Sequence, residues 1–167
     1  MSPEALAERV RARFADVLVA RGEVTALVPP AEVPAALEAL RADPDLSFDQ
    51  LACLTATHHP GAVPAIWLVY ELRSTEHHHR LRVKAGLDGD DAPHAPSVTP
   101  SYPTANWQER EVFDFYGVVF DGHPDLTRIL LPDGWEGHPL LKTEELGGVD
   151  TRYHGAFIPP VDRRTST

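Results

Sequence analysis

The sequence contains only one cysteine, Cys53, among its 167 residues. Iron–sulfur clusters need several thiolates and a structural zinc site usually needs two or more, so this chain by itself cannot hold a cluster. A single cysteine is most often a small core residue, and the apolar run LACLTA around Cys53 predicts that it is buried. If the protein takes part in electron transfer, its redox centres belong to other chains.

Long apolar runs, basic clusters and glycine-rich phosphate loops are also missing. No run approaches the ~20 apolar residues of a membrane span, so we expect no direct membrane insertion. The net charge of −10 repels phosphate backbones, which argues against a nucleic-acid partner. Neither a Gly-x-Gly-x-x-Gly nor a Walker pattern occurs, so we expect neither NADH nor flavin to bind this chain. The first residues lack a charged-then-apolar leader pattern, which predicts a cytoplasmic location.

Hydrophobic periodicity predicts an α+β fold, in which a small mixed or antiparallel sheet packs with helices. Alternating and β-branched runs predict a half-exposed hairpin from the last two strands, and 51–57, although ambiguous, suits a strand. The predicted helices cover residues 3–20, 31–42 and a segment between Thr104 and Gly117, and the predicted strands cover 23–28, 51–57, 65–74 and 80–87. Residues 86–101 are expected to form a loop. One domain, 1–142, is followed by an irregular extended C-terminal arm, 143–167.

Special residues are densest in the segment 107–130, which reads WQEREVFDFYGVVFDGHPDLTRIL. Thr104 is suited to cap the helix that carries its first half, and Gly117 to end that helix in the left-handed conformation. Arg110 and Asp114 stand four residues apart and can pair on one helix face.

The carboxylates of this helix favour a structural role. Glu109 and Glu111 point to different sides of a helix, and nothing nearby supplies a nucleophile for acid–base catalysis. A buried ion-pair network with Arg110 and Arg128 is therefore the preferred interpretation. The aromatic residues around it exceed what one short helix can bury in a small domain, so part of the set is expected to face a partner.

The segment resembles the signature of the C subunit of respiratory NADH:quinone oxidoreductase (bacterial complex I) and of its relatives in membrane-bound hydrogenases. The matching positions are Glu109, Arg110, Glu111, Asp114, Phe115, Tyr116, Gly117, Phe120, Gly122, His123, Pro124, Asp125, Leu126, Arg128, Ile129 and Leu130. A second family motif is matched by residues 135–140 (WEGHPL) and Lys142, with Leu141 and Thr143 departing from its usual Arg and Asp. The resemblance covers about residues 48–142.

This resemblance implies a structural subunit of the hydrophilic arm of a proton-translocating NADH:quinone oxidoreductase, without catalytic residues, metal or cofactor of its own. NADH, flavin, iron–sulfur clusters and quinone would lie in partner subunits, chiefly the quinone-site large subunit and neighbouring iron–sulfur subunits, on the cytoplasmic side of the cell membrane. The expected subunit-interface residues are Trp107, Glu109, Arg110, Glu111, Asp114, Phe115, Tyr116, Gly117, Phe120, Gly122, His123, Pro124, Asp125, Arg128, Trp135 and His138.

Two alternatives stay open. The departures at Leu141 and Thr143 give some weight to the equivalent subunit of an energy-converting nickel–iron hydrogenase-type complex. A stand-alone metalloenzyme would use His123 and His138, but each follows a glycine and precedes a proline, which is typical of turn residues that hydrogen-bond backbone carbonyls. The run 77–79 (HHH) is expected to be solvated at a hairpin tip, because adjacent strand side chains point in alternate directions.

Overall fold

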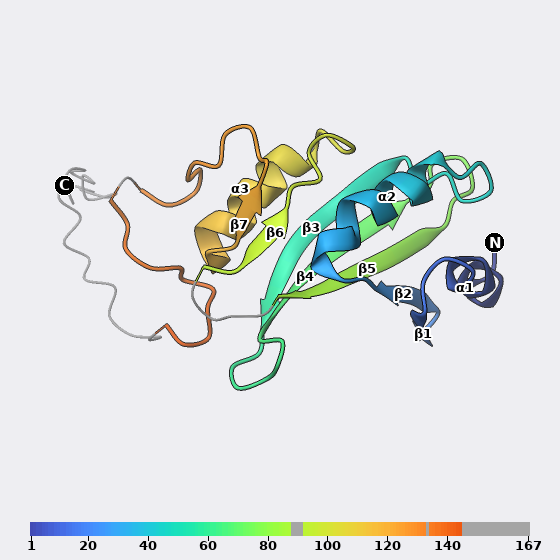
Figure 1. Ribbon diagram of the computed structural model, residues 1–167, viewed down its shortest axis with the longest axis horizontal. Coiled ribbons are helices and arrows are strands. Elements are labelled where there is room, and N and C mark those ends of the chain that lie inside the picture. The colour runs from blue at the N-terminus through green and yellow to red at the C-terminus, as the bar shows by residue number, and fades with distance from the viewer. Residues whose placement is uncertain (88–91, 133, 145–167) are drawn as a thin grey trace, which may run out of the picture.

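A five-stranded mixed sheet forms the centre of the computed structural model, which describes residues 1–87, 92–132 and 134–144 (Figure 1). The strands are Asp16–Ala20 (β1), Glu23–Leu27 (β2), Gln50–His58 (β3), Ile66–Arg73 (β4) and Arg80–Leu87 (β5). Their order in the sheet is β1-β2-β5-β4-β3, and only the β2–β5 pair is parallel. The prediction of an α+β fold around a small mixed sheet is confirmed.

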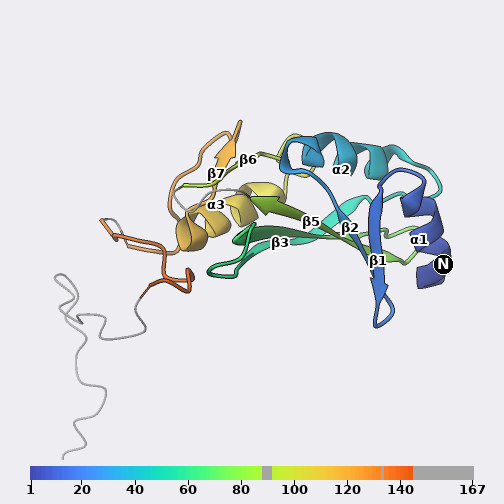
Figure 2. The same ribbon diagram turned by 60° about the horizontal axis from the view of Figure 1, so that its bottom comes forward.

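Helices cover one face of this sheet. The helices are Pro3–Arg11 (α1), Val33–Ala42 (α2, entered through a 3-10 turn at Pro30–Glu32) and Ala105–Tyr116 (α3). Helices α2 and α3 lie over the same face, whereas α1 packs at one end beside β1 and β2 (Figures 1 and 2). A short parallel pair, His94–Pro96 (β6) and Val119–Asp121 (β7), flanks α3. Among the described residues, no helix lies over the centre of the other face of the sheet.

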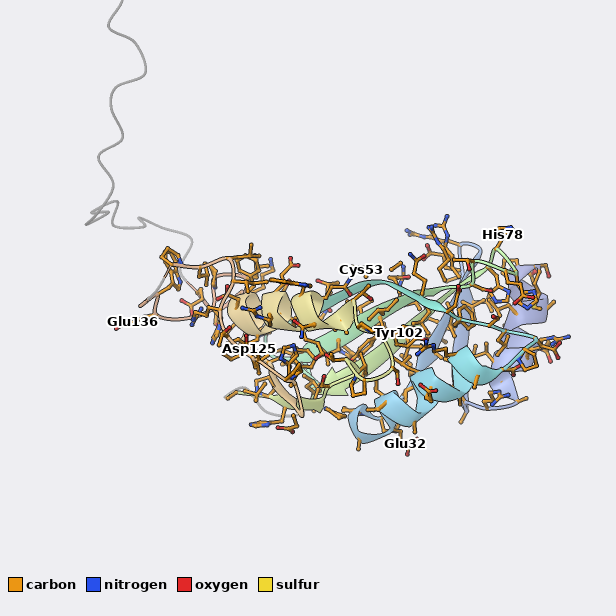
Figure 3. The ribbon with its side chains drawn as sticks, turned by 90° about the horizontal axis from the view of Figure 1, so that it is seen from above. Glu32, Cys53, His78, Tyr102, Asp125 and Glu136 are labelled. Atoms are coloured by element: carbon orange, nitrogen blue, oxygen red, sulfur yellow. The ribbon has the colours of Figure 1, made fainter. Side chains whose placement is uncertain are left out.

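Alternation along the strands supplies the core. On β5 Leu81, Val83 and Ala85 are buried beneath the helices while the intervening basic residues point outward, as the sequence predicted. Tyr102, which lies between α2 and α3 (Figure 3), donates a hydrogen bond of 2.6 Å from its hydroxyl to the carbonyl of Phe48. This bond fixes the approach to α3 against the sheet.

The predicted helix 3–20 is wrong in its second half. Helix α1 ends at Arg11, and β1 pairs antiparallel with β2 across the two-residue connection Arg21-Gly22. Both connecting residues have positive φ, 54° and 78°, as the tight turns that suit the twist of a β-hairpin require. The β1–β2 hairpin therefore forms even though apolar residues continue at helical spacing beyond Arg11.

Two further corrections concern burial on the sheet. Cys53 is exposed, because the β3–β4 register shifts between Leu51 and Cys53 and turns both Ala52 and Cys53 outward. His79, expected to be solvated, is buried: a ring nitrogen lies 2.7 Å from the Leu46 carbonyl oxygen. His78 before it has a φ of 53° within the turn that connects β4 to β5.

The loop predicted over 86–101 contains β6, which the Pro and Asp content concealed. The boundary at 142 and the arm 143–167 stay predictions, since residues 145–167 lie outside the described residues. Within the described ranges, none of the helices has the length and hydropathy needed to cross a membrane.

Candidate docking surface

Helix α3 carries the first half of the signature segment. Its C-terminus is capped by Gly117, which has a φ of 75° and donates its N–H to the Phe113 carbonyl, as predicted. Thr104 does not cap the N-terminus: its backbone is already helical, and its hydroxyl donates to the Leu51 carbonyl of β3 at 3.4 Å. The helix is thereby tied to β3, with which it makes its main contact.

Glu109 is fully buried beneath α3 and joins that helix to the segment that follows β6. Its carboxylate accepts hydrogen bonds from the Ser97 hydroxyl and the Val98 N–H, each at 2.7 Å, and from the Thr99 hydroxyl at 3.2 Å. The His123 ring lies 3.9 Å from the same carboxylate. Burial raises the pKa of Glu109, against the lowering effect of these donors and of His123. Nothing in the sequence pattern pointed to these donors on the predicted loop.

Asp114 is the second fully buried carboxylate and holds the residues after β7, here called the arm segment (residues 122–132 and 134–144). One carboxylate oxygen accepts the backbone N–H groups of Ile129, Leu130 and Leu131, at 3.2, 2.9 and 2.9 Å. The other oxygen lies 2.7 Å from Arg128. Burial by itself would raise the pKa of Asp114, but the three N–H donors and the guanidinium outweigh it and lower that pKa.

The Arg110–Asp114 pair that the spacing allows is not formed, because each residue binds the arm segment instead. Arg110 donates from Nε to the Thr127 carbonyl at 2.9 Å and from Nη2 to the Thr127 hydroxyl at 2.8 Å. The ion-pair network predicted for these carboxylates therefore contains the Arg128–Asp114 pair but not Arg110. A four-residue spacing permits a pair on a helix but does not choose between it and a partner on a distant segment.

The two signature histidines are turn residues bonded to backbone carbonyls, as predicted. The Nε2 atom of His123 lies 3.0 Å from the Asn106 carbonyl oxygen, and its Nδ1 accepts the Asp125 N–H at 3.0 Å. Nδ1 of His138 lies 2.9 Å from the Asp114 carbonyl oxygen. With Nδ1 as acceptor and Nε2 as donor, His123 has no ring nitrogen free for a metal. Across the described residues no group of three or more metal-ligand side chains comes together.

Replacing Gly117 by alanine tests how tightly the arm segment packs on α3. A Cβ at this position would lie 2.7 Å from the His138 ring, and the left-handed backbone itself disfavours a side chain. We expect the free energy of unfolding to fall by about 2 kcal/mol, since the left-handed conformation alone costs roughly 1–2 kcal/mol. Urea unfolding checks this, with Gly134→Ala as control: Gly134 also has positive φ but open space around it. Equal losses in both variants would contradict the packing role.

The expected interface residues divide into a buried and an outward group. The buried members are Glu109, Asp114, Gly117 and Phe120, whereas Trp107, Glu111, Gly122, Pro124 and Asp125 are exposed and Arg110, Phe115, Tyr116, His123, Arg128, Trp135 and His138 are partly buried. Figure 3 shows Asp125 and Glu136 at the α3 end of the molecule, far from His78. The positive φ of 84° at Gly122 confirms the turn predicted there.

Trp107 is the most prominent of the outward residues. Its side chain is 63% exposed, and the Arg110 guanidinium lies 5.1 Å from the centre of its ring. Leu130 and Leu140 on the arm segment are exposed at 56% and 43%. An exposed tryptophan beside an arginine is the typical composition of an interface hot spot. Helix α3 and the arm segment thus expose one tryptophan and two leucines beside the buried part of the signature.

Comparison with known proteins agrees with the resemblance inferred from the signature. Residues 26–150 match the family described as respiratory-chain NADH dehydrogenase, 30 Kd subunit. The chain belongs to this family. It is 47% identical over 151 residues to the C subunit of NADH-quinone oxidoreductase from Salinispora arenicola, covering 90% of this chain and 61% of that protein. The same subunit of Mycolicibacterium smegmatis is 43% identical over 160 residues, covering 95% and 67%. The chain thus spans about three-fifths to two-thirds of the length of these family members.

Two solved structures share the family fold. The trypsin-resistant fragment of Nqo5 superposes with a TM-score of 0.65 at 27% identity, covering 75% of this chain and all of that fragment. A chain of the membrane-bound sulfane sulfur reductase, an archaeal respiratory membrane complex, superposes with a TM-score of 0.66 at 26% identity, covering 78% of this chain and 77% of its own. A similar fold thus occurs in an archaeal respiratory membrane complex as well.

Proposed function

We propose that this chain is a cofactor-free, non-catalytic subunit of the hydrophilic arm of a proton-translocating NADH:quinone oxidoreductase, where it docks on the large subunit that helps form the quinone site. The family and the names of its members support the complex. The docking role rests on one observation: some residues of the signature segment 107–130 are buried and others face outward. Of its buried carboxylates, Glu109 joins α3 to the segment that follows β6 and Asp114 joins α3 to the arm segment, while Trp107 stays outside.

The same division supports a structural rather than a catalytic role. Glu109 and Asp114 are saturated by donors of this chain, so neither has an oxygen facing a substrate. A pre-formed surface loses little conformational entropy on binding, which favours tight association with a partner. Electron transfer would therefore take place entirely in neighbouring subunits on the cytoplasmic side of the membrane, held in place by this one.

Replacing Trp107 by alanine tests the docking surface without disturbing the interior. The side chain is mostly exposed, and its loss removes one cation–π contact with Arg110 from the free subunit. Truncating a hot-spot tryptophan typically costs about 2 kcal/mol or more of binding, which corresponds to at least a tenfold loss of affinity. We expect a tagged Trp107→Ala chain to be recovered at least tenfold less often in the purified complex.

Val63→Ala is the matched control, because Val63 is 93% exposed on the β3–β4 loop and lies outside the signature. Equal urea midpoints for the two variants would show that folding is unchanged. Normal complex yield and normal quinone reduction with Trp107→Ala would overturn the docking role. Arg110→Ala should also disturb assembly, but it additionally breaks the bonds to Thr127.

The equivalent subunit of a hydrogenase-type or related ferredoxin-linked complex is a second candidate. The shared fold with a chain of the sulfane sulfur reductase complex supports it. The neighbouring subunits decide between the two, since a nickel-binding large subunit has cysteine pairs that a quinone-reducing one lacks. Recovery with such a subunit and with hydrogen activity would favour the second candidate.

A further inference from the structure

Helices α2 and α3 lie over one face of the sheet (Figure 2), and the opposite face carries a hollow of about 600 Å³. The strand registers place Thr55 of β3, Val69 of β4, Lys84 of β5 and Leu27 of β2 in one row across this open face. Trp67 lies in the next row, and Leu18 of β1 is 58% exposed at the margin. We use the term open face for the side chains of all five strands that point away from α2 and α3.

The centre of the open face is more apolar than the solvated face of a sheet usually is. Antiparallel sheets with one solvated face usually turn polar side chains toward solvent, whereas here β4 places Trp67 and Val69 on this face, Val69 being only 8% exposed. Gly86 lies opposite Trp67, and a Cβ on it would overlap the Pro64 ring and come within 3.3 Å of the indole. The glycine thus leaves room for Pro64 and for the indole to lie close to the sheet. The Nζ atom of Lys84 lies 4.8 Å from the centre of the Trp67 ring.

On β4 and β5 the charges of the open face are mostly positive, although the chain as a whole is acidic and β1 and β2 add Asp16 and Glu23 to the same face. The outward positions of β4 and β5 hold Arg73, Arg80, Arg82 and Lys84 against one carboxylate, Glu71. Arg82 is paired with Glu71 and with Glu23 of β2. For the other three cations no carboxylate of the described residues comes within 4.0 Å. Arg73 and Arg80 are also direct cross-strand partners, and like charges in that position repel.

We propose that the open face is a second docking surface, which takes an acidic amphipathic helix of a neighbouring subunit. The apolar stripe of that helix would pack on Trp67 and Val69, and its carboxylates would neutralise Lys84, Arg73 and Arg80. A second copy of this chain, placed face to face, would bring these cations against the same cations and is disfavoured by charge. The proposal rests on the proposed function, since it requires a multi-subunit assembly. The subunit then bridges two partners, one on α3 and one on the sheet.

Photo-cross-linking in the purified complex tests this directly. Benzoylphenylalanine placed at Leu18 on the open face, and in a separate preparation at Trp107 on α3, reports the neighbours of each surface by sequencing of the linked peptides. We expect the Leu18 position to capture a peptide of another subunit that has carboxylates beside an apolar stripe. The Trp107 position should capture a different peptide.

The other outcomes of the cross-linking experiment distinguish failure of the second surface from failure of the proposed function. A cross-link from Trp107 but none from Leu18 would overturn the second surface and leave the proposed function intact, and so would capture of lipid or of a second copy at Leu18. A chain that purifies alone would defeat both proposals.

Charge reversal at Lys84 supplies a second measurement. Lys84→Glu should lower retention of the chain in the complex about tenfold at low salt, whereas Lys84→Arg should preserve it. Equal retention of both variants would contradict the charge complementarity.

Discussion

Replacing Asp114 by alanine is expected to release the arm segment from α3. The substitution removes the acceptor of the Ile129, Leu130 and Leu131 N–H groups and the partner of Arg128. Breaking a buried charge pair and leaving its donors without a partner typically costs about 3 kcal/mol or more. That cost corresponds to a roughly hundredfold larger open population of the arm segment. Hydrogen exchange of peptides covering residues 122–132 should accelerate by about the same factor.

Asp125→Ala is the control, since Asp125 is an exposed carboxylate on the arm segment itself. Equal exchange rates in the two variants would show that Asp114 does not hold the arm segment.

The pH dependence of the Asp114 contribution to stability can also be measured. The pKa of Asp114 is lowered in the folded chain, so its contribution is complete above the ordinary aspartate pKa of about 4. The difference between wild type and Asp114→Ala should therefore shrink only as the pH falls below that value.

Replacing Glu109 by alanine is expected to lower the free energy of unfolding by about 3 kcal/mol, through a cavity and a stranded Val98 N–H. Glu109→Gln keeps the volume and an acceptor for that N–H, and its amide can donate to the Ser97 hydroxyl oxygen. At neutral pH the glutamine variant should be at least as stable as wild type, since it carries no buried charge. Urea unfolding gives both values.

Glu111→Ala, on the exposed side of the same helix, should change the stability little. If Glu109→Ala were no less stable than Glu111→Ala, the bonds to Ser97, Val98 and Thr99 would not matter for the fold.

Because burial raises the pKa of Glu109, the folded chain binds the proton more tightly than the unfolded chain. The wild type should therefore gain stability relative to Glu109→Gln as the pH falls from neutral toward the ordinary glutamate pKa of about 4.3. A constant difference over that range would contradict the buried, ionised state.

Features that depend on neighbouring residues could be predicted from the sequence. Gly117 ends α3 because only a residue that tolerates positive φ fits there, and the Gly-His-Pro context of His123 and His138 predicted rings bonded to backbone carbonyls. The basic and apolar alternation of β5 likewise required nothing beyond the strand period. In these cases the local rule and the tertiary fold demand the same residue.

Features that depend on the path of the chain in space could not be predicted from the sequence. The bonds from Arg110 to Thr127 and from Asp114 to the arm segment need the irregular residues after β7 to fold back on α3, which no periodicity encodes. The hydrogen bonds to Glu109 come from a predicted loop that contains a strand. Cys53 lies outside because of one register shift, which an apolar run does not reveal.

The division of the signature also explains why so many special residues occur in one short segment. A helix end, a fully satisfied carboxylate and a turn each require one residue type, and together they turn irregular backbone into a fixed surface. Under the proposed function, the signature acts inside the subunit and would position Trp107 and the exposed leucines for a partner.

A pull-down of the tagged chain from gently solubilised native membranes is the decisive test of the proposed subunit role. We expect recovery together with iron–sulfur subunits and the quinone-site large subunit, and NADH-to-quinone activity in the recovered material. A chain that is recovered alone, carrying a tightly bound metal, would contradict it.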